Sequence, residues 1–229
     1  MPLGQLGAFR LWAEAYARVV EFRFCDERSE AGFSWIVAEP ATRTSHALAA
    51  NGRVWLVDPL RFEPALARAG ELGTFAGVLQ LLDRHKRDCA AIAAELGVSL
   101  HVVPDELPGT PFTTVPVLRR RRWSETALWW EATRTLVVPE AIGTNAFYSA
   151  GRDLAGVHLL LRFAPPRDAL GRFEPDHLLV GHGEGLHGPD AGTGLRQALG
   201  HARSGLPRLM LRAPALAIDA VRRRRPGQR

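Results

Sequence analysis

The sequence predicts a single α/β (α+β) domain in which two β-sheets carry helices on their outer faces. Strand-like runs fall in two groups, over residues 18–57 and 112–138, and each group is followed by segments with helical spacing. Hydrophobic residues make up 46% of the 229 positions, which is enough for a substantial core. We expect the domain to cover residues 1–215 and residues 216–229 to form a basic, disordered tail.

The first half of the chain is expected to contain a hairpin and a strand–helix–strand unit. Residues 45–50 and 53–57 should pair antiparallel, because the Asn51-Gly52 dipeptide between them suits a type I′ turn. A helix should end at Gly97, a typical residue after a helix C-terminus. The other elements expected here are strands over 18–24, 32–38, 75–83 and 99–104, and helices over 62–72 and 88–98.

The second half is expected to form a second sheet followed by helices. Alternating apolar residues predict strands over 112–120, 125–132 and 134–140. Residues 152–163 have helical spacing, residues 175–185 are typical of a strand that runs into a glycine-rich turn, and residues 191–205 indicate a glycine-interrupted helix.

Composition sets limits on compartment and partners. The net charge of +5 comes largely from arginine runs at 119–122 and 222–225, so it gives little support to nucleic acid binding. Cys25 and Cys89 are too few for a disulfide framework. No apolar run is long enough to span a bilayer, so we expect a cytoplasmic protein without a membrane segment. Abundant alanine and arginine with few lysines are typical of a GC-rich, bacterial-type genome.

The order of several motifs resembles that of the metallo-β-lactamase superfamily over residues 45–200. The motifs are VWLVDP at 54–59, DRHKRDC at 83–89, RWSETALWW at 122–130, RTLVVPEA at 134–141 and LLVGHGEG at 178–185. The resemblance implies a four-layer αββα sandwich of two mixed β-sheets. It also implies a metal site at one edge, where loops from both sheets meet.

The superfamily's central motif, T-H-x-H-x-D-H, falls on residues 83–89 of this chain. In this alignment Arg84 and Lys86 replace two histidine ligands, the aspartate is kept as Asp88, and Cys89 stands at the last histidine. Trp123 falls on the next histidine, Glu140 on the aspartate that bridges two metals, His182 on the final histidine, and Asp58 on an aspartate after the hairpin.

Two interpretations of this pattern remain open. In the first, Arg84 and Lys86 pair with Asp88 and Glu140 in place of metal, because a guanidinium cannot serve as a metal ligand. The protein would then hold no cofactor, would be inactive or non-canonical, and would bind a small molecule or a protein partner. Its pocket would contain Asp58, Arg84, His85, Lys86 and Trp123.

The second interpretation retains one zinc or iron ion. Asp88, Cys89, Glu140 and His182, or His85 in place of Glu140, would form a four-coordinate set, with Asp88 as the catalytic candidate. The protein would be a metal-dependent hydrolase of an ester, thioester, lactone or phosphoester. A nucleic-acid-binding protein is a further alternative. The sequence predicts no oligomeric state.

Each residue also has a simpler structural role. His85 at the strand end is expected to face solvent, since it occupies a variable position of the motif. Asp88 could cap the helix that follows it. Cys89 could be a buried apolar residue or, beside several cations, a reactive thiol. The tryptophans of residues 123–130 are expected in the core, and His46 and His187 are lesser candidates for the site.

Overall fold

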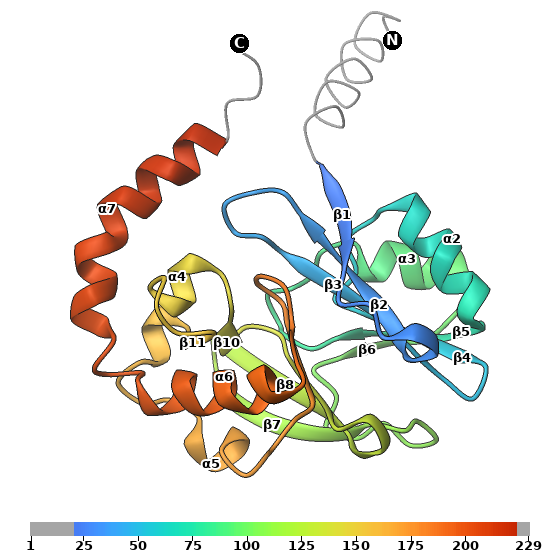
Figure 1. Cartoon of the computed structure of the whole chain (residues 1–229). Helices are drawn as coiled ribbons and strands as arrows, with labels where there is room; N and C mark the ends of the chain where they lie inside the picture. Colours follow the sequence, from blue (N-terminus) through green and yellow to red (C-terminus); the bar gives the residue numbers. More distant parts are fainter. Residues whose placement is uncertain (1–20, 224–229) are drawn as a thin grey trace, which may run out of the picture.

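Two β-sheets lie face to face with helices on their outer sides (Figure 1). The computed structural model describes residues 21–223, so residues 18–20 of the strand expected at 18–24 and the tail residues 224–229 lie outside the described residues. The first sheet has the order β1-β2-β3-β4-β5-β6. Its strands are β1 (Phe22–Cys25), β2 (Gly32–Val37), β3 (Thr44–Ala50), β4 (Arg53–Val57), β5 (Thr74–Gln80) and β6 (Leu100–Val102).

The second sheet has the order β13-β12-β9-β8-β7. Its strands are β7 (Thr113–Arg120), β8 (Trp123–Trp130), β9 (Thr135–Val138), β12 (His177–Val180) and β13 (Leu186–His187). A short ribbon pairs β10 (Ile142–Gly143) with β11 (Gly156–Val157). Both main sheets are mixed, because β4, β5 and β6 run parallel in the first and β9 and β12 run parallel in the second.

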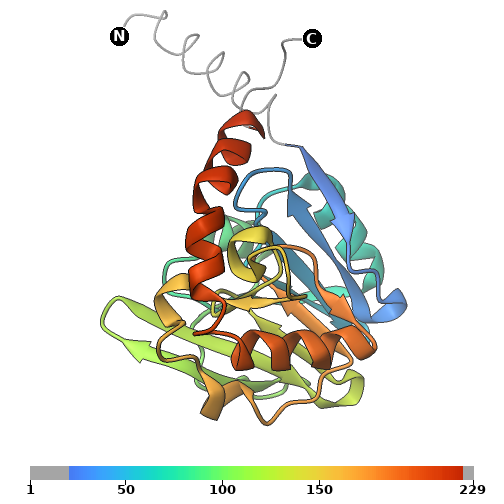
Figure 2. The same cartoon turned by 60° about the vertical axis from the view of Figure 1, so that its left-hand side comes forward.

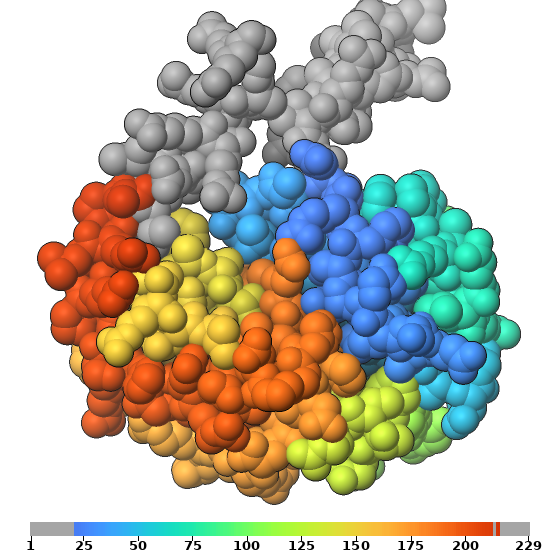
Figure 3. Space-filling model, in the orientation of Figure 1, coloured from blue at the N-terminus to red at the C-terminus, as the bar shows by residue number. Residues whose placement is uncertain are grey.

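Helices cover the two outer faces. On the first sheet lie α2 (Glu63–Leu72) and α3 (Cys89–Leu96), and on the second lie α5 (Arg167–Leu170) and α6 (Pro189–Gly200). Figure 2 shows α7 (Leu206–Arg223) running from the end of α6 past α4 (Ala146–Ser149), and Figure 3 shows these segments meeting on one face. Short 3₁₀ turns are η1 (Ser29–Ala31), η2 (Glu131–Thr133) and η3 (Leu159–Leu161).

Strand alternation divides the core into three apolar layers. In β4, Val54 and Leu56 pack toward α2 and α3, whereas Trp55 and Val57 lie between the sheets. This follows from the two-residue period of a strand, which sends successive side chains to opposite faces. A third layer fills the space between the second sheet and its helices. The expected four-layer αββα sandwich is therefore present.

Most elements of the first half are where the sequence predicted them. The hairpin forms with Asn51 and Gly52 at positive φ (52° and 70°), and β3 pairs antiparallel with β4. The helix before Gly97 ends there, with that glycine at φ 65°. The parallel pairing of β5 with β6 confirms the strand–helix–strand unit.

One prediction for the second half is wrong. Residues 152–163 contain β11 and η3 in place of a helix. Gly156 explains this, because a Cβ there would lie 1.9 Å from the Tyr148 carbonyl oxygen, so the strand approaches α4 more closely than a side chain allows. Helix α7 continues to residue 223, so residues 216–223 are helical and the expected boundary at 215 falls inside a helix. No helix within residues 21–223 has the length and apolarity to cross a membrane.

Candidate metal centre

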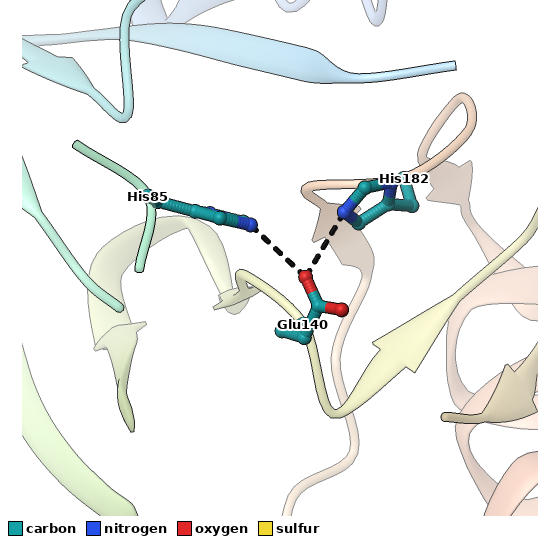
Figure 4. A group of neighbouring side chains, drawn as sticks. All are labelled: His85, Glu140 and His182. Atoms are coloured by element: carbon teal, nitrogen blue, oxygen red, sulfur yellow. Dashed lines mark hydrogen bonds and ion pairs between the residues drawn. The ribbon is translucent and has the colours of Figure 1, made fainter. Parts of the chain in front are cut away.

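Three loops that follow strands bring His85, Glu140 and His182 together at one edge of the sandwich (Figure 4). His85 lies between β5 and α3, Glu140 two residues after β9, and His182 two residues after β12. Since β9 and β12 are parallel neighbours, their carboxyl ends reach the same edge, and the end of β5 faces them from the other sheet. The topology thus explains why residues distant in sequence meet.

The side chains converge on one carboxylate oxygen. Nε2 of His85 and Nε2 of His182 each lie 3.0 Å from Oε2 of Glu140. Ligand atoms of the three residues lie within 4.8 Å of one another, and no other group of this kind occurs among residues 21–223. Two imidazoles and a carboxylate are donors that suit zinc or ferrous iron.

The other ring nitrogen of each histidine has its own partner. Nδ1 of His182 lies 2.8 Å from the carbonyl oxygen of Ala41, which can only accept, so this nitrogen carries hydrogen. Nδ1 of His85 lies 3.1 Å from Oδ2 of Asp58, and the other oxygen of this buried carboxylate accepts from the amide of Leu81 at 3.0 Å. In a neutral ring the lone pair then lies on Nε2, the atom directed at the centre. Partners of this kind typically orient histidine ligands in metal sites.

Donors also hold the second oxygen of Glu140. The Tyr148 hydroxyl donates to Oε1 at 3.2 Å, and Nε2 of His158 lies 3.4 Å from the same atom. Nδ1 of His158 accepts from the amide of Leu160, so the hydrogen of the neutral ring is on the Nε2 that faces Glu140. The carboxylate is therefore fixed from both sides.

Opposing effects set the protonation of the cluster. Burial would raise the pKa of Glu140, but the hydrogen bonds and charges of His182 and His85 outweigh it and hold this pKa far below its usual range. Burial and the Arg87 guanidinium would lower the pKa of His85, but Asp58 and Glu140 outweigh them and raise it. The cluster thus favours an ionised carboxylate.

Glu125 positions the loop that carries Glu140. This buried carboxylate on β8 accepts from the amides of Glu140 at 3.1 Å and Ala141 at 2.8 Å, and from Nε1 of Trp123 at 2.8 Å. Burial raises the pKa of Glu125 to about 7. The loop is therefore tied to the second sheet directly beneath the centre.

Arg87 places a fixed cation beside the centre. Its guanidinium donates to the carbonyl oxygens of Thr44 (2.6 Å), Asp58 (2.7 Å) and Gly181 (3.3 Å), so it joins three segments of the site edge. Burial lowers its pKa, but a guanidinium stays charged at neutral pH.

The structure gathers some of the expected site residues and separates others. Glu140 and His182 lie together, with His85 and Asp58 beside them. Trp123 packs edge to face on His158 at 4.8 Å between ring centroids, and the Arg84 guanidinium lies 4.3 Å from the centre of the Trp123 ring.

The structure does not bring Asp88 or Cys89 into the cluster. Oδ2 of Asp88 accepts from the amide of Arg61 at 2.7 Å, and its side chain forms no cap on α3. Cys89 is fully buried in the apolar layer beneath α2 and α3, and burial raises the pKa of its thiol to about 12. Of the two roles considered for Cys89, the structure shows the buried apolar residue.

The expected cation pairs also fail to form within residues 21–223. Lys86 is exposed without an ion pair, and the nearest carboxylate oxygen to Arg84 belongs to Asp83, at 3.9 Å. The solvent-facing position expected for His85 is wrong as well, since the residue is only 9% exposed. A turn closed by the hydrogen bond from the His85 amide to the Leu82 carbonyl directs this side chain inward.

Sequence reasoning missed Tyr148, His158 and the carbonyl of Ala41. The segment that holds His158 was assigned to a helix, so no contact with Glu140 was foreseen. The one available signal was a histidine directly after Gly156-Val157 in an otherwise apolar run.

Comparison with known proteins identifies the architecture. No family model and no curated protein sequence matches the chain. Solved structures do match: the DIM-1 metallo-β-lactamase exposed to ceftazidime has a TM-score of 0.55 at 13% identity, with 81% of this chain and 96% of the other covered. The chain has the metallo-β-lactamase fold.

Two further structures with this fold extend the comparison. A metallo-β-lactamase from Hirschia baltica has a TM-score of 0.52 at 11% identity, over 81% of this chain and 96% of its own. A chemotaxis sensor, ODP, described as a peroxy diiron species, has a TM-score of 0.51 at 13% identity, over 76% and 93%. At such identities the likeness concerns the fold alone.

Proposed function

We propose that the protein binds one divalent metal ion, zinc or iron, and acts as a metal-dependent hydrolase. Nε2 of His85, Nε2 of His182 and the carboxylate of Glu140 would hold the ion. One observation carries the proposal: both Nε2 atoms converge on the same carboxylate oxygen while both Nδ1 atoms already have acceptors.

The hydrogen bonds of the two histidines favour a cation between their Nε2 atoms and Glu140. A neutral ring that donates from Nδ1 presents a lone pair at Nε2, and a lone pair directed at a carboxylate oxygen is repelled. Without metal, His85 and His182 would each need a second proton to face Glu140 favourably. A divalent ion offers both rings and the carboxylate a common partner.

The surroundings favour one ion and not two. Arg87 contributes a permanent positive charge next to Asp58 and His85, which raises the electrostatic cost of a second metal ion. The remaining donors that the sequence offered, Asp88 and Cys89, are engaged elsewhere.

Hydrolysis is the chemistry that such a centre supports. When bound, an ion of this kind lowers the pKa of water and polarises the bond to be cleaved. Tyr148 and His158 orient Glu140 by donating to its second oxygen, and Glu125 fixes the loop that bears it. The substrate classes we propose are esters, thioesters, lactones and phosphoesters.

The second candidate is a metal-free protein that binds a ligand or partner without catalysis. The position of His85 between two carboxylates, with its pKa raised, favours it, because an imidazolium there would neutralise the cluster. In this case the site would be held together by ion pairs.

Metal analysis separates the two candidates. Untagged protein is analysed by plasma mass spectrometry beside His182→Ala and Glu140→Gln, with His101→Ala on β6 as a matched control. Near-stoichiometric zinc or iron in the wild type and control, lost from the two site variants, supports the proposal. No tightly bound metal in the wild type after growth in zinc- and iron-supplemented medium refutes it and favours the metal-free protein.

The hydrolase assignment needs its own measurement. The metal-loaded protein is assayed against an acetate ester, a thioester, a lactone and a phosphodiester, with His182→Ala as the blank. Turnover that disappears in this variant supports hydrolysis. If the ion binds and no substrate class is turned over, the hydrolase assignment fails while the metal site stands.

A further inference from the structure

A cavity of about 170 Å³ lies where α4, β11, α6 and the start of α7 meet. It is distinct from the metal centre, although Tyr148 borders both: its hydroxyl donates to Glu140, and the residue also lines the cavity. None of His85, Glu140 and His182 lines it. The cavity can therefore be considered independently of the proposed metal ion.

The lining carries an excess of positive charge. Arg152, Arg162 and Arg208 line the cavity together with one carboxylate, that of Asp153. Oδ2 of Asp153 lies 3.2 Å from Nδ1 of His201, another lining residue. Within the described part of the chain, none of the three guanidinium groups forms a direct ion pair, although the charge of the Asp153 carboxylate acts on Arg162 from a greater distance.

Arg162 is the strongest sign that the cavity is built for an anion. It is 3% exposed, and its guanidinium donates only to main-chain carbonyls, those of Tyr148 and, at 3.3 Å, Ala202. Its Nε has no hydrogen-bond partner within the described residues. Burying a cation without a directly paired anion is costly, and an anionic ligand beside Arg162 would offset part of this cost.

We propose that this cavity binds the phosphate group of a small phosphorylated molecule. Three guanidiniums can surround a dianion with several donors at once, whereas a single carboxylate needs only one bidentate arginine. The hydroxyls of Ser149 and Ser204 also line the cavity and can donate to phosphate oxygens. Its volume of about 170 Å³ suits a phosphate with a small organic body.

Two exposed arginines allow a test that does not disturb the core. Arg152 and Arg208 are exposed, in contrast to Arg162, so glutamine at either position should leave folding intact. Arg172→Gln is the matched control, because this exposed arginine lies outside the cavity and stacks on Phe173. The full-length protein in chloride buffer is titrated with inorganic phosphate and with glycerol phosphate by calorimetry.

We expect saturable binding that weakens at least tenfold in Arg208→Gln and Arg152→Gln and is unchanged in Arg172→Gln. Binding should also persist in His182→Ala, which disrupts the metal centre only. Absence of saturable binding for both probes overturns the proposal. Binding that is lost in His182→Ala but kept in Arg208→Gln also overturns it, because phosphate would then sit at the metal centre.

Discussion

Replacing Asp58 by asparagine should weaken metal binding without removing any metal ligand. The carboxylate accepts from Nδ1 of His85 at 3.1 Å and from the Leu81 amide at 3.0 Å. Asparagine has one acceptor oxygen and one NH₂ group. If the oxygen stays with the Leu81 amide, the NH₂ group faces Nδ1 of His85 and requires that nitrogen to accept. The hydrogen of the ring then moves to Nε2, the atom proposed to bind the ion.

The size of the expected loss in metal affinity depends on which hydrogen bonds Asp58→Asn keeps. Both hydrogen bonds of residue 58 survive with reversed polarity at His85, so we expect little change in the stability of the metal-free protein. Loss of a partner that orients a histidine ligand typically lowers metal affinity by about 10- to 100-fold. This corresponds to about 1.4 to 2.8 kcal/mol of binding free energy.

Competition against a chromogenic zinc chelator measures this affinity, and thermal unfolding of the metal-free protein checks the fold. Asp88→Asn is the matched control, because this aspartate ends the loop that contains His85 and accepts from the Arg61 amide, outside the cluster. Zinc affinity that falls in Asp88→Asn and not in Asp58→Asn would refute the assignment of the centre.

Three further outcomes are expected. Glu125→Gln should lower the free energy of unfolding in urea by about 1–3 kcal/mol, because the new NH₂ group would face the Nε1–H donor of Trp123. The loss should be smaller in a Trp123→Phe background, which lacks that donor; an equal loss in both backgrounds would contradict the contact between Glu125 and Trp123. Burial lowers the pKa of His46 to about 3, so below about pH 6.5 the unfolded chain takes up a proton that the native protein excludes. The free energy of unfolding should therefore fall by up to about 1.4 kcal/mol per pH unit between about pH 6.5 and 3. The fall should be less steep in His46→Gln. Ellman's reagent should leave Cys25 and Cys89 unmodified in native protein and titrate both after denaturation, because both thiols are buried; rapid native reaction of either would contradict this.

The fold could be predicted because its signals are local and repeated. The Asn51-Gly52 turn, the apolar alternation of β4 and the glycine that ends α3 each specify one element, and their order specifies the sandwich. The segment at 152–163 failed because its leucines follow helical spacing while Gly156 packs against the main chain of α4. That contact is tertiary and leaves no periodic trace in the sequence.

The site could be predicted only where a residue directly follows a strand. The resemblance assigned Glu140 and His182 to the site, and the structure places each two residues beyond a clear apolar strand, at an edge that the parallel pairing of β9 and β12 defines. His85 lies inside a turn, where strand alternation no longer determines the direction of a side chain. Alignment to a motif therefore placed Asp88 and Cys89 in the site, although the turn directs His85 there.

Arg84 and Lys86 stand where the resemblance predicted histidine ligands, and the charges at this edge are arranged differently from that expectation. The acidic groups of the centre, Asp58 and Glu140, require positive charge nearby, and Arg87 supplies part of it permanently through the loops it joins. A second permanent cation from Arg84 would complete the neutralisation, but its guanidinium lies over Trp123 instead. The positive charge that is still missing can be provided between the Nε2 atoms and Glu140, either by protons on the rings or by a metal ion. The metal content of the purified protein therefore decides directly which cation this fold uses.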